Sequence, residues 1–442
     1  MSVRILVGDC REVLKTLPDG SVDSIVTDPP YDLTSGKNGG TGAASVNLDS
    51  PYGRARIGTG NGAGGFMGLA WDSTGVAFDP ETWRECLRVL KPGGHLLAFG
   101  GTRTYHRMVC AIEDAGFEIR DQIGWAYGSG FPKSLDVSKA IDKAAGAERE
   151  VVGRRTDGRY AYGFTEQAKK ALGRVVAESS ETGFSGEMGQ ITEPATEAAR
   201  QWQGWGTALK PAWEPICLAR KPLAGTVAAN VLAHGTGALN IDGCRIGVSD
   251  AAYARNHSGD RGHAGTRSAD EVGATDLRPG GGSASNQGRW PPNLIHDGSD
   301  EVLAAFPRDA GAASRVSGTE PSAASVGRVT GERSRVAGVY HADSGSAARF
   351  FYCAKADRAD RNDGGADNTH PTVKPTDLMR YLCRLVTPPG GTVLDPFMGS
   401  GSTLKAAELE GFDAIGIELS PEYAEIAKWR IGADAPLFRE VT

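Results

Sequence analysis

Segments typical of strands alternate with segments typical of helices at both ends of the chain, and this alternation constrains the fold more than any other feature. Short runs of apolar and β-branched residues, bounded by turn residues, predict buried strands. They lie near 4–8, 23–28, 94–99, 118–125, 392–395 and 414–418. The predicted helices lie at 80–91, 105–115 and 402–410 and from 420 onward, and the Lys-Pro-Gly-Gly stretch at 91–94 is predicted to end the first of them. Since a strand–helix–strand succession builds a parallel sheet with helices on both faces, the sequence predicts an α/β fold.

Glycine makes up 61 of the 442 residues and gathers in segments with little strand or helix character. The segment 36–69 is the most glycine-rich, and the cost in backbone entropy disfavours regular structure there. The stretches 255–289 and 308–346 are also loop-like, and we expect an ordered island between them at 289–296, which contains two prolines and a tryptophan. The segment 36–69 is therefore predicted to be either a lid over a site or a surface insertion.

Composition excludes several classes of protein. The seven cysteines are scattered without a Cys-x-x-Cys pair, which argues against a zinc ribbon or a disulfide scaffold and predicts reduced, mostly buried thiols without a metal site. No apolar run reaches the roughly 18–20 residues that span a bilayer, and no leader is apparent, so we expect a cytoplasmic protein without a membrane partner. The net charge of −6 argues against non-specific coating of nucleic acid but leaves local binding open.

The first candidate site is the run Asp28-Pro29-Pro30-Tyr31, at the end of the second predicted strand. Two prolines hold the backbone extended and remove two N–H donors. Asp28 adds a carboxylate acceptor, and Tyr31 offers a flat face for stacking. An amino group on a planar ring would be recognised by these groups, although the same run also suits an ordinary turn. Its position favours a site, because open α/β sheets bind ligands at the carboxyl ends of their strands.

The second candidate site is the run 394–403, Leu-Asp-Pro-Phe-Met-Gly-Ser-Gly-Ser-Thr, which predicts a strand, a glycine turn and a helix. Gly399 and Gly401 allow close approach of a ligand to the backbone N–H groups at the helix start. The run lacks the third glycine of a dinucleotide fingerprint and the lysine of a phosphate loop. Glu418, at the end of the next predicted strand, is placed to bind two ribose hydroxyls. The combination predicts a nucleoside ligand without a pyrophosphate and excludes a nicotinamide dehydrogenase.

Four motifs in one order give the chain a family resemblance. The opening at 5–9, the DPPY run, the segment His370-Pro-Thr-Val-Lys-Pro375 and the run 394–403 together resemble the amino-methylating DNA methyltransferases that use S-adenosylmethionine. The order, with the catalytic motif first and the cofactor motif last, resembles the β class of that family. The resemblance implies a site-specific DNA methyltransferase that methylates an exocyclic amine of a flipped-out base.

For the target base, the resemblance implies roles for the first motif. Asp28 and the carbonyl of Pro29 would accept hydrogen bonds from the amino group, Pro30 would shape the turn, and Tyr31 would stack on the base. Acceptors fixed in advance stabilise the positive charge that develops on the attacking nitrogen. No covalent enzyme intermediate is needed, so the resemblance gives the cysteines no catalytic role.

For the cofactor, the resemblance implies contacts from three segments of the chain. The methionine part would be surrounded by Asp395, Phe397, Gly399, Gly401 and Ser402, and the ribose would be bound by Glu418. His370, Thr372 and Lys374 would close over the carboxylate of the cofactor, although His370 would serve equally as a surface histidine. Asp9 would accept from the adenine amino group or, alternatively, cap the helix that follows it.

The resemblance also implies a circularly permuted, doubly wound and mostly parallel sheet of seven strands. Its seventh strand is an antiparallel one at 214–219, which adds to the six listed above. The chain would divide into a catalytic half at 1–149, an insertion at 150–208, a returning strand at 209–224, a target-recognition region at 225–345 and a cofactor-binding half at 346–442.

Adenine N6 is the favoured target, because cytosine-N4 members of the family more often have serine where this chain has Asp28. Methylation of cytosine N4 stays an alternative, as does a catalytically idle DNA-binding protein. The expected partner is double-stranded DNA. A homodimer and a separate restriction nuclease are further partners that the resemblance leaves open.

Overall fold

The computed structural model describes residues 2–32, 74–130, 134–154, 190–247, 288–310, 345–354, 360, 368, 370 and 373–432. The segment 36–69, most of the two loop-like stretches at 255–289 and 308–346, and Thr372 lie outside this part of the chain. The prediction of a lid at 36–69 therefore stays a prediction.

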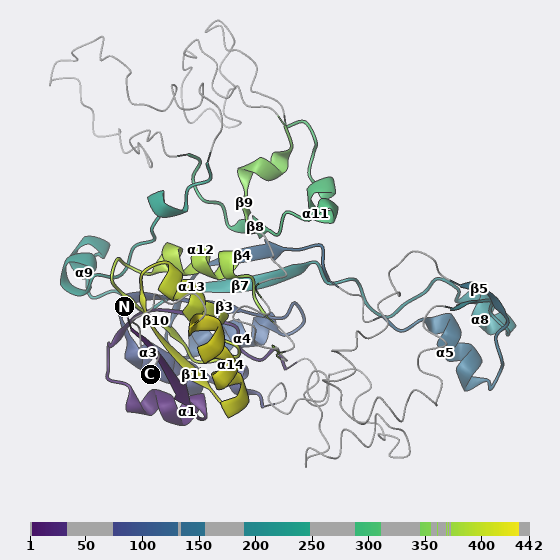
Figure 1. The fold of residues 1–442 in the computed structure, drawn as a ribbon, viewed down its shortest axis with the longest axis horizontal. Coiled ribbons are helices and arrows are strands. Elements are labelled where there is room, and N and C mark those ends of the chain that lie inside the picture. The colour runs from purple at the N-terminus through teal and green to yellow at the C-terminus, as the bar shows by residue number, and fades with distance from the viewer. Residues whose placement is uncertain are drawn as a thin grey trace, which may run out of the picture.

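A single large sheet holds both ends of the chain together (Figure 1). Its strands, in spatial order, are β1 (Val3–Val7), β11 (Asp413–Glu418), β10 (Thr392–Asp395), β2 (Val22–Thr27), β3 (Leu90–Phe99), β7 (Trp213–Arg220), β4 (Glu118–Ala126), β8 (Leu294–His296) and β9 (Tyr352–Cys353). Only β7 runs antiparallel to its neighbours, so the predicted α/β, mostly parallel sheet is confirmed.

The number of strands differs from the predicted seven. All seven predicted strands are present, but β8 and β9 extend the sheet beyond β4, which makes nine strands among the described residues. The two additional strands have three and two residues, which is too short for an alternating pattern to reveal them. The island predicted at 289–296 is ordered, and its last three residues form β8.

Strand β3 begins earlier than predicted. The Lys-Pro-Gly-Gly stretch at 91–94 was expected to separate a helix from a strand, whereas it belongs to β3, and the helix α3 (Pro80–Val89) ends before it. Gly93 has a φ of 76°, a conformation that glycine adopts without strain. The pairing of β2 with β3 shifts register between Val22 and Ser24, so the extra residues form an irregularity in the strand instead of a break.

Helices cover both faces of the sheet, as the alternation predicts. One face packs against α1 (Cys10–Val13), α3 and α4 (Tyr105–Asp114), and the other packs against α12 (Thr376–Val386), α13 (Ser402–Leu409) and α14 (Pro421–Gly432). Successive residues of the central strands alternate between the two cores: Ile25 joins the first and Val26 the second. Strands that are buried on both faces have continuous apolar runs in the sequence, and such runs predicted these strands.

A smaller unit lies apart from the main sheet (Figure 1). It combines α5 (Val137–Ala144), α8 (Glu197–Gln201) and the two-stranded sheet of β5 (Val151–Arg154) and β6 (Gln190–Thr192). Asp142 is fully buried there, and its Oδ2 forms an ion pair with Arg149 at 2.7 Å within the unit.

The helices in the described part of the chain include none with the length and apolar character that a membrane span requires.

Candidate active site

Two distant runs of the sequence meet because β10 lies beside β2. In parallel strands the carboxyl ends share one edge of the sheet, so Asp395, the last residue of β10, lies close to Asp28, which follows β2. The next strand out, β11, ends at Glu418. Beyond it, β1 ends two residues before Asp9. Four neighbouring strands thus bring four acidic residues to one edge.

A cavity of about 1010 Å³ opens at this edge. Its size suits a nucleoside cofactor together with a second planar group. Most of the sequence-predicted site residues line it: Asp9, Asp28, Pro29, Pro30, Tyr31, His370, Lys374, Asp395, Phe397, Gly399, Ser402 and Glu418. Thr372 lies outside the described residues, and Gly401 does not line the cavity.

Gly401 has a packing role. Its φ is 82°, and a Cβ built there would lie 2.8 Å from the Cβ of Ala427 on α14. The glycine therefore lets α13 start close against α14. Gly399, by contrast, has a φ of 55° and faces His370, whose Nε2 would lie 2.9 Å from an added Cβ. A side chain at Gly399 would displace the imidazole that lines the cavity, so this glycine maintains the space in it.

Asp395 holds the two motifs together. Its Oδ1 accepts hydrogen bonds from the Thr27 hydroxyl at 2.6 Å and from the Phe397 N–H at 3.0 Å, and its Oδ2 accepts from the Thr403 hydroxyl at 2.5 Å. Only 2% of the residue is exposed, and burial raises the pKa of this carboxyl to about 6. These bonds fix the turn after β10 against the end of β2. Thr27 and Thr403, which the motif analysis did not single out, are part of that connection.

Glu418 supports the glycine turn from the next strand. Its Oε2 accepts from the Gly399 N–H and its Oε1 from the Ser420 N–H, each at 2.8 Å. Burial raises the pKa of the Glu418 carboxyl above its ordinary value, although the backbone N–H groups of Ser420, Gly399 and Leu419 oppose this effect. A carboxylate offers about four acceptor positions, so Glu418 keeps acceptor capacity for a hydroxyl in the cavity.

Asp9 caps the helix α1, which is the alternative that the sequence left open. Its Oδ1 accepts from the Arg11 N–H at 3.0 Å, and its Oδ2 pairs with the Arg11 guanidinium at 2.6 Å. The Arg11 hydrogen bond lowers the pKa of the Asp9 carboxyl. The cap accounts for Asp9 without a ligand, although the residue also borders the cavity.

We expect Asp9→Ala to lower the free energy of unfolding by about 1 kcal/mol, because an N-cap acceptor is lost. Asp9→Asn should keep most of that stability, since asparagine caps helices equally well. Denaturant unfolding measures both variants. If Asp9→Asn instead weakened binding of S-adenosylhomocysteine severalfold with stability unchanged, the capping role would be insufficient.

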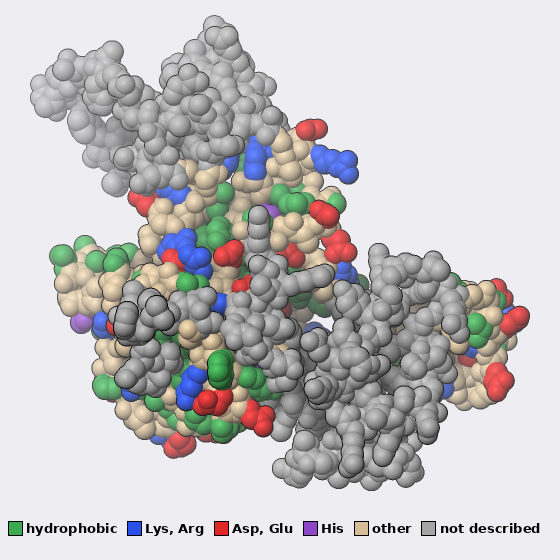
Figure 2. Space-filling model, in the orientation of Figure 1, with side chains coloured by type: hydrophobic (Ala, Val, Ile, Leu, Met, Phe, Trp, Pro, Cys, Tyr) green, Lys and Arg blue, Asp and Glu red, His purple; other side chains and the backbone are tan. Residues whose placement is uncertain are grey.

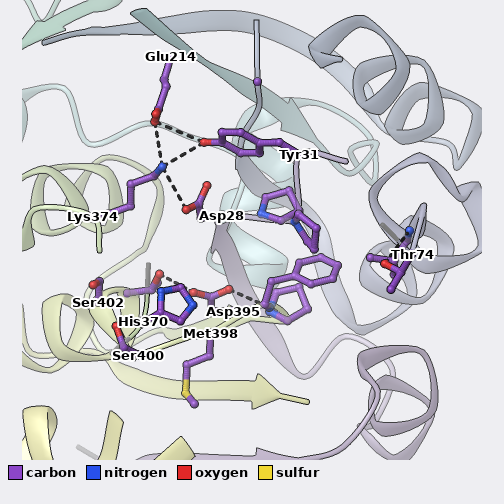
Figure 3. A pocket seen from close by; sticks show the side chains of 18 of the residues that line it. Asp28, Tyr31, Thr74, Glu214, His370, Lys374, Asp395, Met398, Ser400 and Ser402 are labelled. Carbon is purple, nitrogen blue, oxygen red and sulfur yellow. Dashed lines mark hydrogen bonds and ion pairs between the residues drawn. The ribbon is translucent and has the colours of Figure 1, made fainter. Parts of the chain in front are cut away.

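Asp28 is the one of the four acidic residues that keeps a buried oxygen without a hydrogen-bond partner among the described residues. Its Oδ2 lies 3.1 Å from Lys374 Nζ, whereas its Oδ1 is buried and unpaired (Figure 3). A buried anionic oxygen without a partner is costly, and such atoms mark places where a ligand donates. The neighbouring Tyr31 ring lines the same cavity.

Lys374 has partners other than the predicted cofactor carboxylate. Its Nζ lies 3.0 Å from the Tyr31 hydroxyl and 2.9 Å from Glu214 Oε2, in addition to its contact with Asp28. Burial opposes the charge, but the carboxylates of Asp28 and Glu214 raise the pKa of Lys374 above its ordinary value. The structure therefore places Lys374 beside the first motif, and its contact with a cofactor carboxylate stays a prediction. Glu214 was not predicted as a site residue at all.

Arg430 supports the second motif from α14. Its guanidinium is fully buried, and Nη1 donates to the Ser400 carbonyl at 2.5 Å, to Ser400 Oγ at 3.0 Å and to Ser402 Oγ at 3.2 Å. Ser400 and Ser402 both line the cavity. A hydroxyl that accepts from a cation keeps its own proton for donation, so these two serines can donate to an anion in the cavity.

Side chains of both charges are interspersed on the face shown in Figure 2, in keeping with the small net charge.

All seven cysteines are free thiols, and five of them are buried. Burial raises the pKa of the Cys10, Cys217 and Cys244 thiols to about 12. Buried thiols of this kind are poor nucleophiles. No group of acidic, histidine and cysteine side chains in the described part of the chain is arranged to hold a metal ion.

The sheet and the cavity at its carboxyl edge define a doubly wound α/β protein whose ligand site combines a glycine turn with a DPPY strand end. The chain belongs to the family of N6 and N4 DNA methylases, whose family model matches residues 22–145 and 316–429. The first matched stretch contains Asp28, and the second contains the glycine turn and Glu418.

Curated relatives match over shorter stretches. The type II methyltransferase M.Cfr9I of Citrobacter freundii is 34% identical over 106 residues, which is 21% of this chain and 35% of the relative. M.HpaI of Haemophilus parainfluenzae is 29% identical over 143 residues, 32% of this chain and 37% of the relative. The chain thus spans just over a third of the length of these curated relatives.

Solved structures of methyltransferases also align with the chain. The complex of M1.HpyAVI with S-adenosylmethionine aligns with 97% of this chain and 98% of its own, at 14% identity and a TM-score of 0.37. The cytosine-N4-specific PvuII DNA methyltransferase aligns with 97% of this chain and 86% of its own, at 13% identity and a TM-score of 0.40.

Proposed function

We propose that this protein methylates N6 of adenine in double-stranded DNA, with S-adenosylmethionine as the methyl donor. Membership of the DNA methylase family supports the reaction class, and the choice of adenine rests on Asp28 at a position where cytosine-N4 members more often have serine. The observation that carries the proposal is the buried Oδ1 of Asp28, which has no hydrogen-bond partner in the described part of the chain and lies beside the Tyr31 ring at the carboxyl end of β2. It offers an acceptor for an exocyclic N–H and an aromatic face for the base.

The residues around the cavity suit the cofactor. Glu418 keeps acceptor capacity that we propose for the ribose hydroxyls, and Gly399 leaves space where a side chain would strike His370. Ser400 and Ser402, with Arg430 behind them, are proposed to hold the carboxylate of the methionine part. This arrangement is an alternative to the carboxylate contact that the resemblance implies for Lys374. When bound, S-adenosylmethionine supplies an electrophilic methyl group and leaves as a neutral thioether.

The residues of the chain would act on the amino group of the base. Asp28 accepts one N–H, which favours a pyramidal nitrogen whose electron pair is free to attack. The nitrogen gains a positive charge as the new N–C bond forms and then releases one proton to the solvent. A negative group fixed beside it stabilises that charge in the transition state. The base must leave the duplex to reach this depth, and such extrusion is usual for enzymes that modify bases.

The test is to express the protein in cells without DNA methylation and to sequence their DNA with detection of modified bases. Nucleoside analysis of the same DNA should give N6-methyladenine, in one recognition sequence. N4-methylcytosine instead would support the cytosine alternative, and no modified base, with purified protein still binding DNA, would support an idle DNA-binding protein. The target-recognition role of 225–345, a homodimer and a separate nuclease stay predictions of the resemblance.

The role of Glu418 leads to a separate prediction. We expect Glu418→Ala to weaken binding of S-adenosylhomocysteine about tenfold or more, because hydrogen bonds to a charged group contribute about 1.5–3 kcal/mol. Calorimetry measures the affinity. Glu422→Ala, four positions further along the chain and exposed on α14, is the control and should leave it unchanged. Equal affinities of Glu418→Ala and the control would contradict the ribose role.

A further inference from the structure

Three segments that are far apart in the sequence meet around the ammonium group of Lys374. Asp28 follows β2, Glu214 is the second residue of β7, and Lys374 precedes α12. The Nζ of Lys374 lies 3.1 Å from Asp28 Oδ2, 2.9 Å from Glu214 Oε2 and 3.0 Å from the Tyr31 hydroxyl (Figure 3). The Tyr31 hydroxyl also donates to Glu214 Oε2, at 3.3 Å.

Glu214 reaches this place because β7 is antiparallel to its neighbours. The parallel strands end at the cavity, whereas β7 begins there. Its first residues therefore face the same edge as the ends of β2 and β10. The Glu214 side chain is 18% exposed, against 9% for Lys374 and 22% for Asp28. Because all three side chains are mostly buried, solvent screens the interactions between their charges only weakly.

The three groups carry two negative charges and one positive charge. If Glu214 were absent, Lys374 and Asp28 would form a neutral pair, with the ammonium 3.1 Å from Asp28 Oδ2. The repulsion by Lys374 would then offset part of the attraction between Asp28 and a nitrogen that becomes positive beside it. With Glu214 present, the set keeps one net negative charge. The remaining titratable groups near it are the phenols of Tyr31 and Tyr127 and the carboxyl of Asp395. Burial raises the pKa of both phenols, so they stay neutral, and it raises the pKa of Asp395 to about 6, so that this group can only add negative charge.

We infer that Glu214 is a positioning residue that neutralises Lys374, so that Asp28 presents a net negative charge to the amino group being methylated. It also orients the Tyr31 ring through the shared hydroxyl contact. The inference rests on the proposed function, since it concerns the same reaction. It assigns to the start of β7 a part in catalysis that neither the motifs nor the family match places there.

The experiment compares four proteins in single-turnover methyl transfer from tritiated S-adenosylmethionine to unmethylated double-stranded genomic DNA: wild type, Glu214→Gln, Glu214→Gln combined with Lys374→Met, and Glu118→Gln. We expect Glu214→Gln to reduce the rate about 10²- to 10³-fold, as for loss of one preorganised electrostatic group. The double variant restores the net negative charge and should regain at least tenfold over Glu214→Gln. Binding of S-adenosylhomocysteine, measured by calorimetry, should change less than threefold in Glu214→Gln.

Glu118→Gln is the matched control, because Glu118 pairs with Arg220 at 2.6 Å at the other end of β7. It should keep the wild-type rate. A double variant no faster than Glu214→Gln, or a Glu214→Gln variant at the wild-type rate with its melting temperature unchanged, overturns the inference. Wild-type protein that methylates no DNA contradicts the proposed function itself, whereas an active wild type with a failed rescue contradicts only the role of Glu214.

Discussion

Asp28→Ala is expected to abolish methyl transfer while S-adenosylhomocysteine binds with nearly wild-type affinity. The variant removes the only one of the four acidic residues at the sheet edge that keeps a buried oxygen without a partner in the described part of the chain. The other three hold protein groups: Asp9 caps α1, Asp395 fixes the turn after β10, and Glu418 accepts from the glycine turn. Loss of Asp28 should therefore affect the target base and spare the cofactor.

The fold should tolerate this change. Removal of one partner from a buried ion pair is often costly, because the other charge is left alone. Lys374, however, keeps Glu214 at 2.9 Å after Asp28 is gone. Tritium transfer to DNA and calorimetry on the same preparation separate the two effects. Asp28→Asn keeps the shape without the charge and should be at least 10²-fold slower than wild type. Activity within tenfold of wild type in either variant would exclude Asp28 as the catalytic acceptor.

Arg430→Met is expected to weaken binding of S-adenosylhomocysteine by about 10- to 100-fold. The guanidinium lies directly behind the hydroxyls of Ser400 and Ser402, which line the cavity. Charge-assisted hydrogen bonds contribute about 1.5–3 kcal/mol, and this range corresponds to the expected loss. Because the arginine is fully buried, its removal also lowers stability, so affinity for one ligand alone would not separate the two effects.

A second ligand separates them. Methylthioadenosine shares the adenosine and the sulfur of the cofactor but has no amino-acid carboxylate. If Arg430 acts on the carboxylate through the two serines, the variant should bind methylthioadenosine almost as well as wild type does. Equal loss for both ligands would mean that Arg430 only holds the turn in shape. Lys428→Met, on the exposed side of the same helix and paired with Glu425, is the control and should bind both ligands normally.

The sequence predicted the central part of the fold because that part depends on local patterns. Strands buried on both faces need continuous apolar runs, and the helices between them need capping residues and breakers, so all seven strands were found. The prediction was wrong where local signals conflict with pairing. The Lys-Pro-Gly-Gly stretch at 91–94 has the composition of a break but forms part of β3, because the sheet accommodates it through a shift in register.

The candidate site was predicted only as far as the motifs extend. Asp28, Tyr31 and Glu418 belong to runs whose residue types and positions indicate a ligand site, and the structure brings them to one cavity. Lys374 was predicted at the cavity but with a different partner, because the sequence does not tell which charges become neighbours. Gly401, although part of the motif, serves packing against Ala427. A glycine in a motif does not by itself indicate whether a ligand or a helix approaches it.

Local sequence patterns were sufficient to predict the α/β class, the order of the strands along the chain and the two motifs, because hydrophobic periodicity and turn chemistry act over short distances. The partners of the side chains across the cavity, in contrast, depend on how the fold places distant segments. The antiparallel direction of β7 brings Glu214 to Lys374, and the packing of α14 brings Arg430 beneath the glycine turn. Both contacts depend on the relative placement of distant segments, and burial makes their charges strong enough to matter.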